Sequence, residues 1–200
     1  FEELGYRDEA ERACFVLETD RGPPDGLVEK VAEDCRLAPD KLTFVLTPTS
    51  SLAGTVQIVS RVLEVALHKV HELRFPLGRV IDGIGRAPLP PPAPDFLSAM
   101  GRTNDAILFG GEVQLFVTGP DDEAAELARS LPSSASRDYG RPFKEIFAAV
   151  EGDFYAIDPM LFSPAKVLVS ALESGRSFTA GQLDPDLLAR SFASENGQVA

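Results

Sequence analysis

Four polar side chains recur at helical spacing in an otherwise apolar stretch, and their types could do chemistry. Gln57, Arg61, Glu64 and His68 are separated by four, three and four residues. On an α-helix these intervals place the four side chains on one narrow face. A carboxylate beside a guanidinium can position a water molecule and take its proton, so Glu64 is a candidate general base and Arg61 the group that holds it. The alternative is a solvent-facing seam whose ion pair contributes about a few tenths of a kcal/mol. Spacing alone does not separate the two.

Two further segments carry polar groups that could hold a ligand. The run MGRTND places Arg102 and Asn104 beside the end of an expected helix, where they could either cap the helix or bind a ligand. The run LPSSASRDYGRPF gathers Ser134, Arg137 and Asp138. Hydroxyls beside an arginine can bind an amide-rich ring or an anion, although such a loop often means only a solvated turn.

Several other kinds of site are not supported by the residue patterns. His68 and His71 could share a metal ion, but no third ligand stands at helical spacing, so we predict no metal site. The sequence has no Gly-x-Ser-x-Gly elbow, and Gly83-Ile84-Gly85 is too short for a dinucleotide fingerprint. Five glycines remain candidates for turns or for close backbone approach: Gly83, Gly85, Gly101, Gly110 and Gly111.

Composition narrows the class of partner. The chain has 200 residues and a formal net charge of −12, with no cluster of Lys and Arg, so we predict no nucleic-acid partner. No stretch approaches the roughly 20 apolar residues that span a bilayer, so we predict no membrane partner. Cys14 and Cys35 lack the spacing of a zinc site or a disulfide framework and are typical of reduced, cytoplasmic cysteines.

Strand and helix patterns alternate along the chain. We expect strands at 13–18, 41–46, 106–117 and 166–172, and helices at 26–36, 51–73, 96–104, 121–131 and 143–150. The proline-rich segment 81–96 should run as an extended wall or linker, because proline lacks an N–H and fixes φ. This alternation predicts an α/β fold of mixed sheets with packed helices, with residues 1–200 as a single unit.

Four motifs in this order carry a family resemblance. They are TPTSSLAGTVQIVSRVLEVALHK, VIDGIGRAPLPPPAPDFLSAMGRTNDAILFGGEVQLFV, LPSSASRDYGRPF and GDFYAIDPMLFSPA. Over about residues 10–192 the chain resembles methenyltetrahydromethanopterin cyclohydrolases. Any one motif alone would be weak, but the four together are specific. The resemblance covers the C-terminal two-thirds of the family pattern, so the chain is expected to be the C-terminal portion of a longer two-domain enzyme with a cleft between its domains.

The resemblance implies a reaction and a way of working. In this family 5,10-methenyl-tetrahydromethanopterin and water give the 5-formyl compound, reversibly, in one-carbon metabolism and without a metal or redox cofactor. A cytoplasmic homo-oligomer, a trimer, is implied, with the pterin in the cleft between the domains. The helical Arg-x-x-Glu associated with the hydrolytic water matches Arg61 and Glu64. The remaining candidates for pterin binding are Gln57, His68, Arg102, Asn104, Ser134, Arg137 and Asp138.

Three alternatives stay open at this stage. One is hydrolysis of the analogous folate. Another is a non-catalytic or incomplete pterin-binding or oligomerisation subunit. The third concerns a second carboxylate for proton return, which could be Asp105, Asp138, Asp153 or Asp158, with Asp138 and Asp158 favoured, although each could equally cap a turn.

Overall fold

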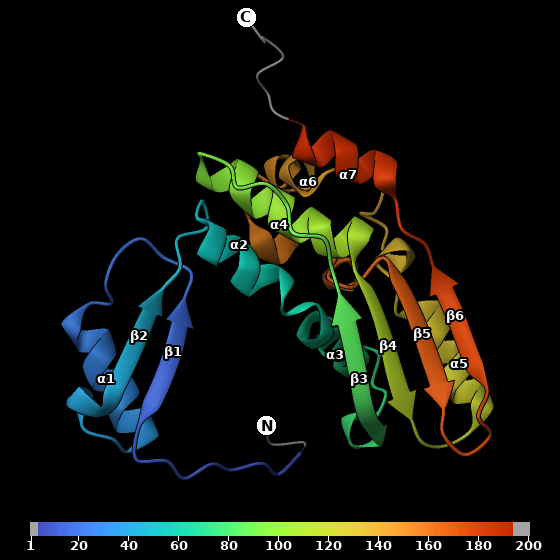
Figure 1. The fold of residues 1–200 in the computed structure, drawn as a ribbon, viewed down its shortest axis with the longest axis horizontal. Coiled ribbons are helices and arrows are strands. Elements are labelled where there is room, and N and C mark those ends of the chain that lie inside the picture. The colour runs from blue at the N-terminus through green and yellow to red at the C-terminus, as the bar shows by residue number, and fades with distance from the viewer. Residues whose placement is uncertain (1–3, 194–200) are drawn as a thin grey trace, which may run out of the picture.

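The computed structural model describes residues 4–193, and two separate sheets lie within that range. Figure 1 shows a small unit around β1, α1 and β2 beside a larger body that holds the rest. The elements follow one another as β1 (Ala13–Leu17), α1 (Asp25–Cys35), β2 (Leu42–Leu46), α2 (Leu52–Val59), α3 (Val62–Glu72), β3 (Val80–Arg86), α4 (Phe96–Gly110), β4 (Glu112–Val117), α5 (Asp121–Ser130), α6 (Phe143–Ala149), β5 (Lys166–Ala171), β6 (Ser177–Gly181) and α7 (Pro185–Phe192). The predicted mixed α/β class is therefore confirmed.

The small sheet is a parallel pair. β1 and β2 run in register from Ala13 opposite Leu42 to Leu17 opposite Leu46, and α1 connects them. The rings of Phe15 and Phe44 stack with centroids 5.6 Å apart. Because the strands are parallel, their carboxyl ends meet at one edge of the sheet. The segments that follow the two strands therefore start side by side.

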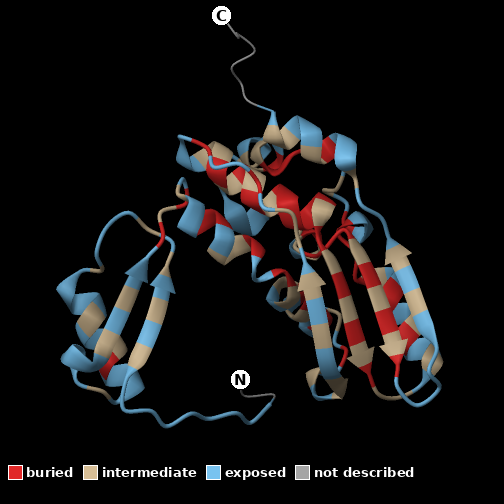
Figure 2. Ribbon diagram, in the orientation of Figure 1, coloured by how far each residue is buried: buried red, intermediate tan, exposed pale blue. Residues whose placement is uncertain are grey.

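The larger sheet has the order β3-β4-β5-β6 and is mixed. β4 and β5 pair in parallel, while β3 and β6 add antiparallel at the two edges. Alternate side chains of β4 and β5 point to one buried face, which α3 and α5 cover. The buried residues of the two central strands are Val113, Leu115, Val117, Val167, Val169 and Ala171. Figure 2 shows this buried band continuing into α4.

α4 is the central helix of the larger body. It packs against α2, α6 and α7, and four consecutive residues from Ala106 to Phe109 are buried. Phe109 and Leu108 join Phe143 and Ile146 of α6 in a second apolar cluster. A helix that is buried on this much of its surface is held by packing on several sides. This packing positions the side chains in the first half of α4, which include Phe96, Met100 and Asn104.

The prediction of one long helix over 51–73 is wrong, because the helix is interrupted at Ser60 and Arg61. α2 ends at Val59 and α3 begins at Val62, with Arg61 at φ −89° and ψ 15°. The Ser60 hydroxyl donates to the carbonyl of Gln57 at 3.2 Å, and the N–H of Arg61 donates to Ile58 in a tight turn. A serine that bonds the preceding turn competes with the helical pattern and favours such a bend. The bend is visible between α2 and α3 in Figure 1.

Two further expectations are corrected around the glycine-rich strand region. The strand expected over 106–117 begins only at Glu112, because α4 continues to Gly110 and its apolar residues are buried on several sides. The extended segment expected over 81–96 contains strand β3, which ends before Pro88 removes the first backbone donor.

β6 and α7 were not expected from the sequence. β6 is a five-residue edge strand in which Ser177, Thr179 and Gly181 are exposed, so Phe178 and Ala180 alone supply its apolar signal. The remaining expected elements, 13–18, 26–36, 41–46, 121–131, 143–150 and 166–172, are confirmed to within one or two residues at each end.

Close packing at Gly85 places α3 against the sheet. A Cβ built on Gly85 would lie 2.8 Å from a methyl carbon of Val62, and one on Gly83 would lie 2.8 Å from Leu63. The missing side chains therefore let the first turn of α3 approach β3 closely. This confirms the expectation that Gly83 and Gly85 serve close approach, and it fixes the end of α3 where Arg61 and Glu64 stand.

Candidate active site

The Arg61–Glu64 pair survives the break in the helix because Arg61 is the N-cap residue of α3 and Glu64 lies in its first turn. Nε of Arg61 donates to Oε2 of Glu64 at 2.7 Å, and Nη2 donates to Oε1 at 2.7 Å. This is a two-point contact, the strongest geometry between these groups. The hydrogen bonds raise the pKa of Arg61 and lower the pKa of Glu64. The carboxylate is therefore ionised and oriented at neutral pH.

Solvent exposure limits how much the Arg61–Glu64 ion pair contributes to the stability of the fold. The side chains of Arg61 and Glu64 are 54% and 61% exposed. Ion pairs in water contribute about 0–1 kcal/mol, so the pair is a weak source of stability. A catalytic role for Glu64 and Arg61 stays a prediction.

A cavity of about 340 Å³ lies beside Arg61 and is bounded by several elements. Its walls come from the end of β1, from α2, α3 and α4, and from the loop before β5. Five of the eight lining residues are apolar, and the other three carry charge or hydrogen-bonding groups. The lining residues are Glu18, Ile58, Arg61, Val65, Phe96, Met100, Asn104 and Phe154.

Glu18 is the acidic residue that the sequence reasoning missed. It follows β1 directly and lines the cavity together with Arg61, and its negative charge is one of the causes that raise the pKa of Arg61. The hydroxyl of Thr49 donates to its Oε1 at 2.6 Å. Ligands of α/β proteins commonly lie beyond the carboxyl ends of parallel strands. A glutamate directly after the first of two such strands was the available signal.

The loop after β2 is held rigidly beside Glu18. The N–H and the hydroxyl of Thr47 both donate to the carbonyl of Leu17, at 2.8 and 3.1 Å. Ser51 caps α2 by accepting from the N–H of Gly54 at 3.0 Å. A Cβ at Gly54 would collide with the carbonyl of Pro48, so the tight loop requires glycine there.

A second cavity of about 390 Å³ adjoins the first, because both are lined by Glu18 and Phe96. Its other walls come from the two loops that follow β1 and β2 and from the segment that precedes α4. The two cavities therefore form neighbouring compartments at the carboxyl edge of the small sheet. The remaining lining residues of the second cavity are Thr19, Asp20, Pro48, Thr49, Ser50 and Pro94.

Of the other predicted residues, Asn104 reaches this region. It lines the first cavity, and its side-chain amide donates to the carbonyl of Met100 at 2.9 Å. Gln57 lies near the end of α2, and its Nε2 is buried with no hydrogen-bond partner among the described residues. His68 is exposed on α3, with Nε2 3.9 Å from a carboxylate oxygen of Glu72. Binding roles for all three stay predictions.

Arg102 holds the backbone of two other segments. Its guanidinium donates to the carbonyls of Pro91 and Pro92 at 3.3 and 3.1 Å, and to the carbonyl of Ala193 at 3.3 Å. Carbonyl contacts of this kind fasten the proline-rich segment and the end of α7 to α4. Arg102 lines a different cavity from Arg61, so the structure does not bring the two arginines to one site.

The predicted loop residues Ser134, Arg137 and Asp138 lie apart from the cavity lined by Arg61. Ser134 is exposed, and the backbone N–H of Arg137 donates to Oδ2 of Asp158 at 3.3 Å. Oδ2 of Asp138 accepts from the N–H of Asp158 at 2.9 Å. Asp138 and Asp158 therefore tie two loops together, as the turn-capping alternative supposed.

The other two acidic candidates also have backbone partners. Oδ1 of Asp105 accepts from the N–H of Phe143 at 2.8 Å inside the protein, and Asp153 caps a 3-10 turn by accepting from Tyr155 at 3.0 Å. Burial raises the pKa of Asp105 to about 7. Neither residue lines the cavity with Arg61, whereas Glu18 does.

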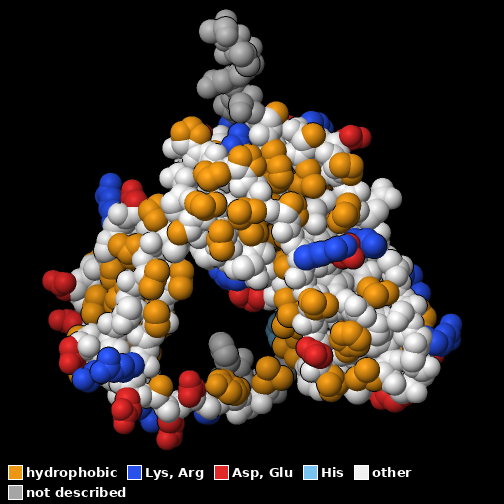
Figure 3. Space-filling model, viewed as in Figure 1, with side chains coloured by type: hydrophobic (Ala, Val, Ile, Leu, Met, Phe, Trp, Pro, Cys, Tyr) orange, Lys and Arg blue, Asp and Glu red, His pale blue; other side chains and the backbone are white. Residues whose placement is uncertain are grey.

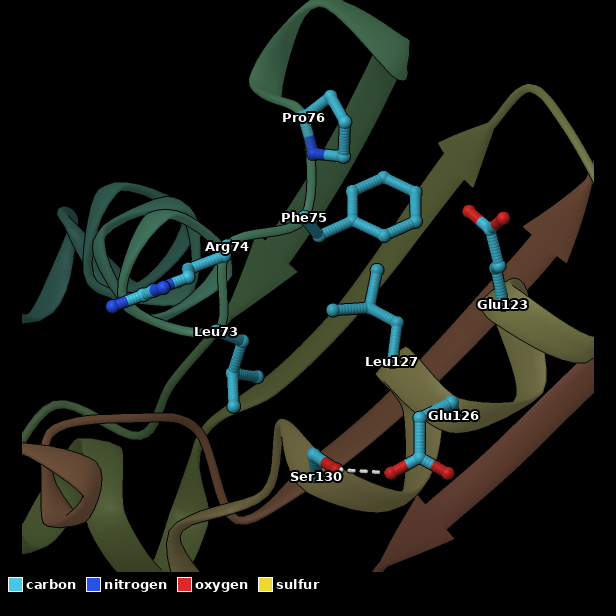
Figure 4. Close-up of a pocket in the computed structure, with 8 residues that line it drawn as sticks. All are labelled: Leu73, Arg74, Phe75, Pro76, Glu123, Glu126, Leu127 and Ser130. Atoms are coloured by element: carbon cyan, nitrogen blue, oxygen red, sulfur yellow. Dashed lines mark hydrogen bonds between the residues drawn. The ribbon is translucent and has the colours of Figure 1, made fainter.

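A further cavity of about 290 Å³ lies between the end of α3 and α5. Figure 4 shows Phe75 and Leu127 facing each other across it, with Ser130 hydrogen-bonded to Glu126 and the side chain of Arg74 turned away from the glutamates. None of the residues predicted to act on a substrate lines this cavity. It therefore offers no competing site for the predicted chemistry.

The described part of the chain, residues 4–193, has neither a cluster of metal ligands nor a membrane-spanning helix. No group of three or more His, Cys, Asp and Glu side chains there could hold a metal ion. No helix there is long and apolar enough to cross a membrane.

Comparison with known proteins identifies the family of the chain. A family model described as Cyclohydrolase (MCH) matches residues 1–192. The chain is 66% identical over 192 residues to a methenyltetrahydromethanopterin cyclohydrolase of Methylobacillus flagellatus, covering 96% of the chain and 59% of that protein. The corresponding protein of Xanthobacter autotrophicus is 63% identical over 190 residues, covering 95% and 56%.

A methenyltetrahydromethanopterin cyclohydrolase of Methylosinus trichosporium is 60% identical over 192 residues, covering 96% of the chain and 74% of that protein. The chain thus spans less than three fifths of the length of the first two relatives. With a family model that matches nearly the whole chain and relatives at this identity, the chain belongs to the cyclohydrolase (MCH) family.

Proposed function

We propose that the protein hydrolyses 5,10-methenyl-tetrahydromethanopterin to 5-formyl-tetrahydromethanopterin, with Glu64 as the general base. The observation that carries the proposal is the two-point contact of Glu64 with Arg61, a residue that lines a cavity, within a chain of this family. The names of the relatives support the same substrate and reaction. The reaction runs in either direction, and no metal or redox cofactor takes part.

The reaction requires the protein to position the substrate and a water molecule and to accept one proton from that water. The methenyl carbon lies between two nitrogens in a cationic amidinium and is already electrophilic. Water attacks this carbon, and Glu64 takes one proton from the water as the carbon–oxygen bond forms. The bond to one nitrogen then breaks as the hydroxyl proton passes to that nitrogen. The formyl group remains on the other nitrogen, and one proton is released to solvent.

The charges around Arg61 suit a cationic substrate. Glu18 and Glu64 both act on the Arg61 guanidinium, so the three groups together carry one net negative charge. Arg61 orients the carboxylate and keeps it ionised. The lowered pKa of Glu64 makes it a weaker base. A weaker base is sufficient because the attacked carbon is strongly electrophilic. The attraction between the carboxylates and the cationic substrate accelerates the reaction only to the extent that it grows toward the transition state.

Replacement of Glu64 tests the proposal. We expect Glu64→Gln to lower kcat by roughly 10²–10⁴-fold, the usual contribution of general-base catalysis, and to leave the fold intact. The measurement is the loss of the methenyl chromophore on mixing with 5,10-methenyl-tetrahydromethanopterin. The matched control is Glu126→Gln, since Glu126 forms an exposed contact with Arg129 at the same three-residue spacing on α5. Wild-type turnover in Glu64→Gln would remove Glu64 from the mechanism.

The carrier can be distinguished in the same assay. The folate analogue has the same amidinium on a different tail, so both carriers are tested at equal concentration. We expect faster turnover of the methanopterin form, because the relatives are named for it. Turnover of neither carrier by a folded protein would favour the non-catalytic alternative.

The setting of the site is also part of the proposal. We infer that the pterin lies in a cleft between two α/β domains of a cytoplasmic homotrimer, and that this chain is the C-terminal portion of the longer enzyme. The family resemblance supports this arrangement. The space-filling view shows an opening beneath α2 and α3, between the small sheet and β3 (Figure 3).

A further inference from the structure

Two phenylalanine rings are exposed at the wall of the cavity that contains Arg61. Phe96 is 61% exposed and Phe154 is 42% exposed, and both line this cavity. Phenylalanine is among the side chains most often buried, so two exposed rings at one cavity need an explanation. Phe96 is the first residue of α4, whereas Phe154 belongs to a 3-10 turn far along the chain. The fold therefore brings them together from separate segments.

The ring of Phe154 is supported from behind. It stacks on Phe162 with centroids 4.9 Å apart and an angle of 24° between the ring planes. It also contacts Phe143 of α6 at 6.1 Å. Asp153 caps the turn that carries Phe154. A ring held in this way loses little freedom when a ligand contacts its exposed part, which favours binding.

Phe96 is positioned by the start of α4. The carboxylate of Asp95 accepts from the N–H of Ser98 at 2.8 Å and caps the helix immediately before Phe96. Phe96 lines both neighbouring cavities, so its ring stands where the two compartments meet. A ligand that extends from one compartment into the other would pass this ring.

The rest of the first cavity divides by polarity. Ile58, Val65 and Met100 supply an apolar wall, while Glu18, Arg61 and Asn104 supply charge and hydrogen-bonding groups. A flat ring with polar edges fits such a lining, with its faces against apolar groups and its edges toward polar ones. An amidinium cation gains further from lying near an aromatic face.

We propose that Phe96 and Phe154 are substrate-binding residues that hold the flat ring system of the pterin in the cavity lined by Arg61. This inference rests on the proposed function for the identity of the ligand. It adds that recognition of the ring depends on two aromatic side chains rather than on the polar loop 134–138. Neither phenylalanine takes part in proton transfer.

The test compares Phe96→Leu and Phe154→Leu with two matched controls. Phe147→Leu removes a ring of the same aromatic cluster, since Phe147 stacks on Phe143 at 6.2 Å but does not line the cavity. Tyr155→Leu removes the neighbouring ring, which is 97% exposed. For each variant we would measure kcat and KM for 5,10-methenyl-tetrahydromethanopterin, the Kd for tetrahydromethanopterin, and the melting temperature.

We expect KM and Kd to rise roughly tenfold or more in each cavity variant, as for the loss of one stacking contact on a heteroaromatic ring. kcat should stay within about twofold, because contacts made equally in the ground and transition states affect binding alone. Phe154→Tyr should restore most of the affinity. The controls should keep wild-type KM and Kd.

The possible outcomes separate this inference from the proposed function. If the wild type binds tetrahydromethanopterin without hydrolysing the methenyl form, the proposed function fails, and the Kd comparison still decides the role of the rings. If the wild type does not bind tetrahydromethanopterin, both fail. Cavity variants with wild-type KM and Kd, or with a lowered melting temperature as their only change, would overturn the role of the rings.

Discussion

At the scale of single residues, the site is organised around one arginine between two glutamates. Glu64 contacts Arg61 through two hydrogen bonds, and Glu18 acts on the same guanidinium from the end of β1. The two glutamates lie 46 positions apart in the sequence. Glu64 is oriented by Arg61 and Glu18 by Thr49, so each carboxylate has its own positioning partner. They are therefore expected to contribute differently.

Glu18 should serve attraction and orientation rather than proton transfer. We expect Glu18→Gln to lower kcat/KM by roughly tenfold, mainly through KM, since one negative charge near a cationic substrate is lost; tenfold corresponds to about 1.4 kcal/mol. Salt screens such attraction, so the wild type should lose more activity than the variant as ionic strength rises. The assay is chromophore loss at low and high salt.

An exposed glutamate of the small unit supplies the control. Glu29 lies on α1 and does not line the cavity, so Glu29→Gln should behave as the wild type at both salt concentrations. An equal effect of the Glu18 and Glu29 substitutions would mean that only net charge matters.

At the scale of elements, the junction of α4 with α6 contains a buried carboxyl group. Asp105 of α4 accepts from the N–H of Phe143, the first residue of α6, and is fully buried. Desolvation raises its pKa to about 7, the neighbouring charge of Glu145 acts in the same direction, and the hydrogen bond from Phe143 opposes it. Because the ring of Phe143 contacts that of Phe154, this junction lies behind one wall of the cavity.

Asp105 should make stability depend on pH in a defined direction. Its pKa in the folded state exceeds the ordinary value of 3.8, so the folded protein binds the proton more tightly than the unfolded chain. Its contribution to stability is fully present below about pH 4 and is lost as the pH rises through 7. We expect Asp105→Asn, which keeps the acceptor without the charge, to remove this loss, of the order of a few kcal/mol.

The measurement is the free energy of unfolding in denaturant at pH 5 and pH 8, for the wild type and the variant. The difference between the two proteins isolates Asp105 from other titrating groups. The wild type should lose more stability than Asp105→Asn between the two pH values. Parallel pH dependence in both proteins would show that Asp105 does not titrate in this range.

At the scale of the whole molecule, buried polar contacts join segments that are distant in sequence. Lys69 of α3 is fully buried, and its ammonium group donates to the carbonyls of Pro132 and Met160 at 2.8 and 2.7 Å. Desolvation lowers its pKa to about 8. These contacts fasten the loops before α6 and before β5 to the helix that carries Glu64. The position of the Arg61–Glu64 pair thus depends on much of the larger body.

The proposed trimer is a prediction at this scale. We expect the whole protein to have three times the mass of one chain in light scattering, at concentrations used in the activity assay. Glu64→Gln should have the same mass, because the Glu64 side chain is exposed and is assigned no role in assembly. A monomeric, fully active protein would contradict the trimer and leave the chemistry unaffected.

Local pattern alone determined a good part of this protein. The apolar runs of β1, β2 and β5 and the polar start of α5 were sufficient to identify these elements, because each has the period of its own structure. The three-residue spacing of Arg61 and Glu64 identified their pairing, because both the turn at Arg61 and an unbroken helix bring these positions together. The ordered motifs identified the family, which the comparisons confirm.

Only the tertiary structure decided the rest, since it depends on contacts between distant segments. α4 extends to Gly110 because packing on several sides buries its apolar residues, and these read locally as a strand. Glu18, Phe96 and Phe154 lie far apart in the sequence and meet at one cavity only after the parallel strands, α4 and the 3-10 turn are in place. Local periodicity carries no information about such meetings, because they depend on how separate elements pack.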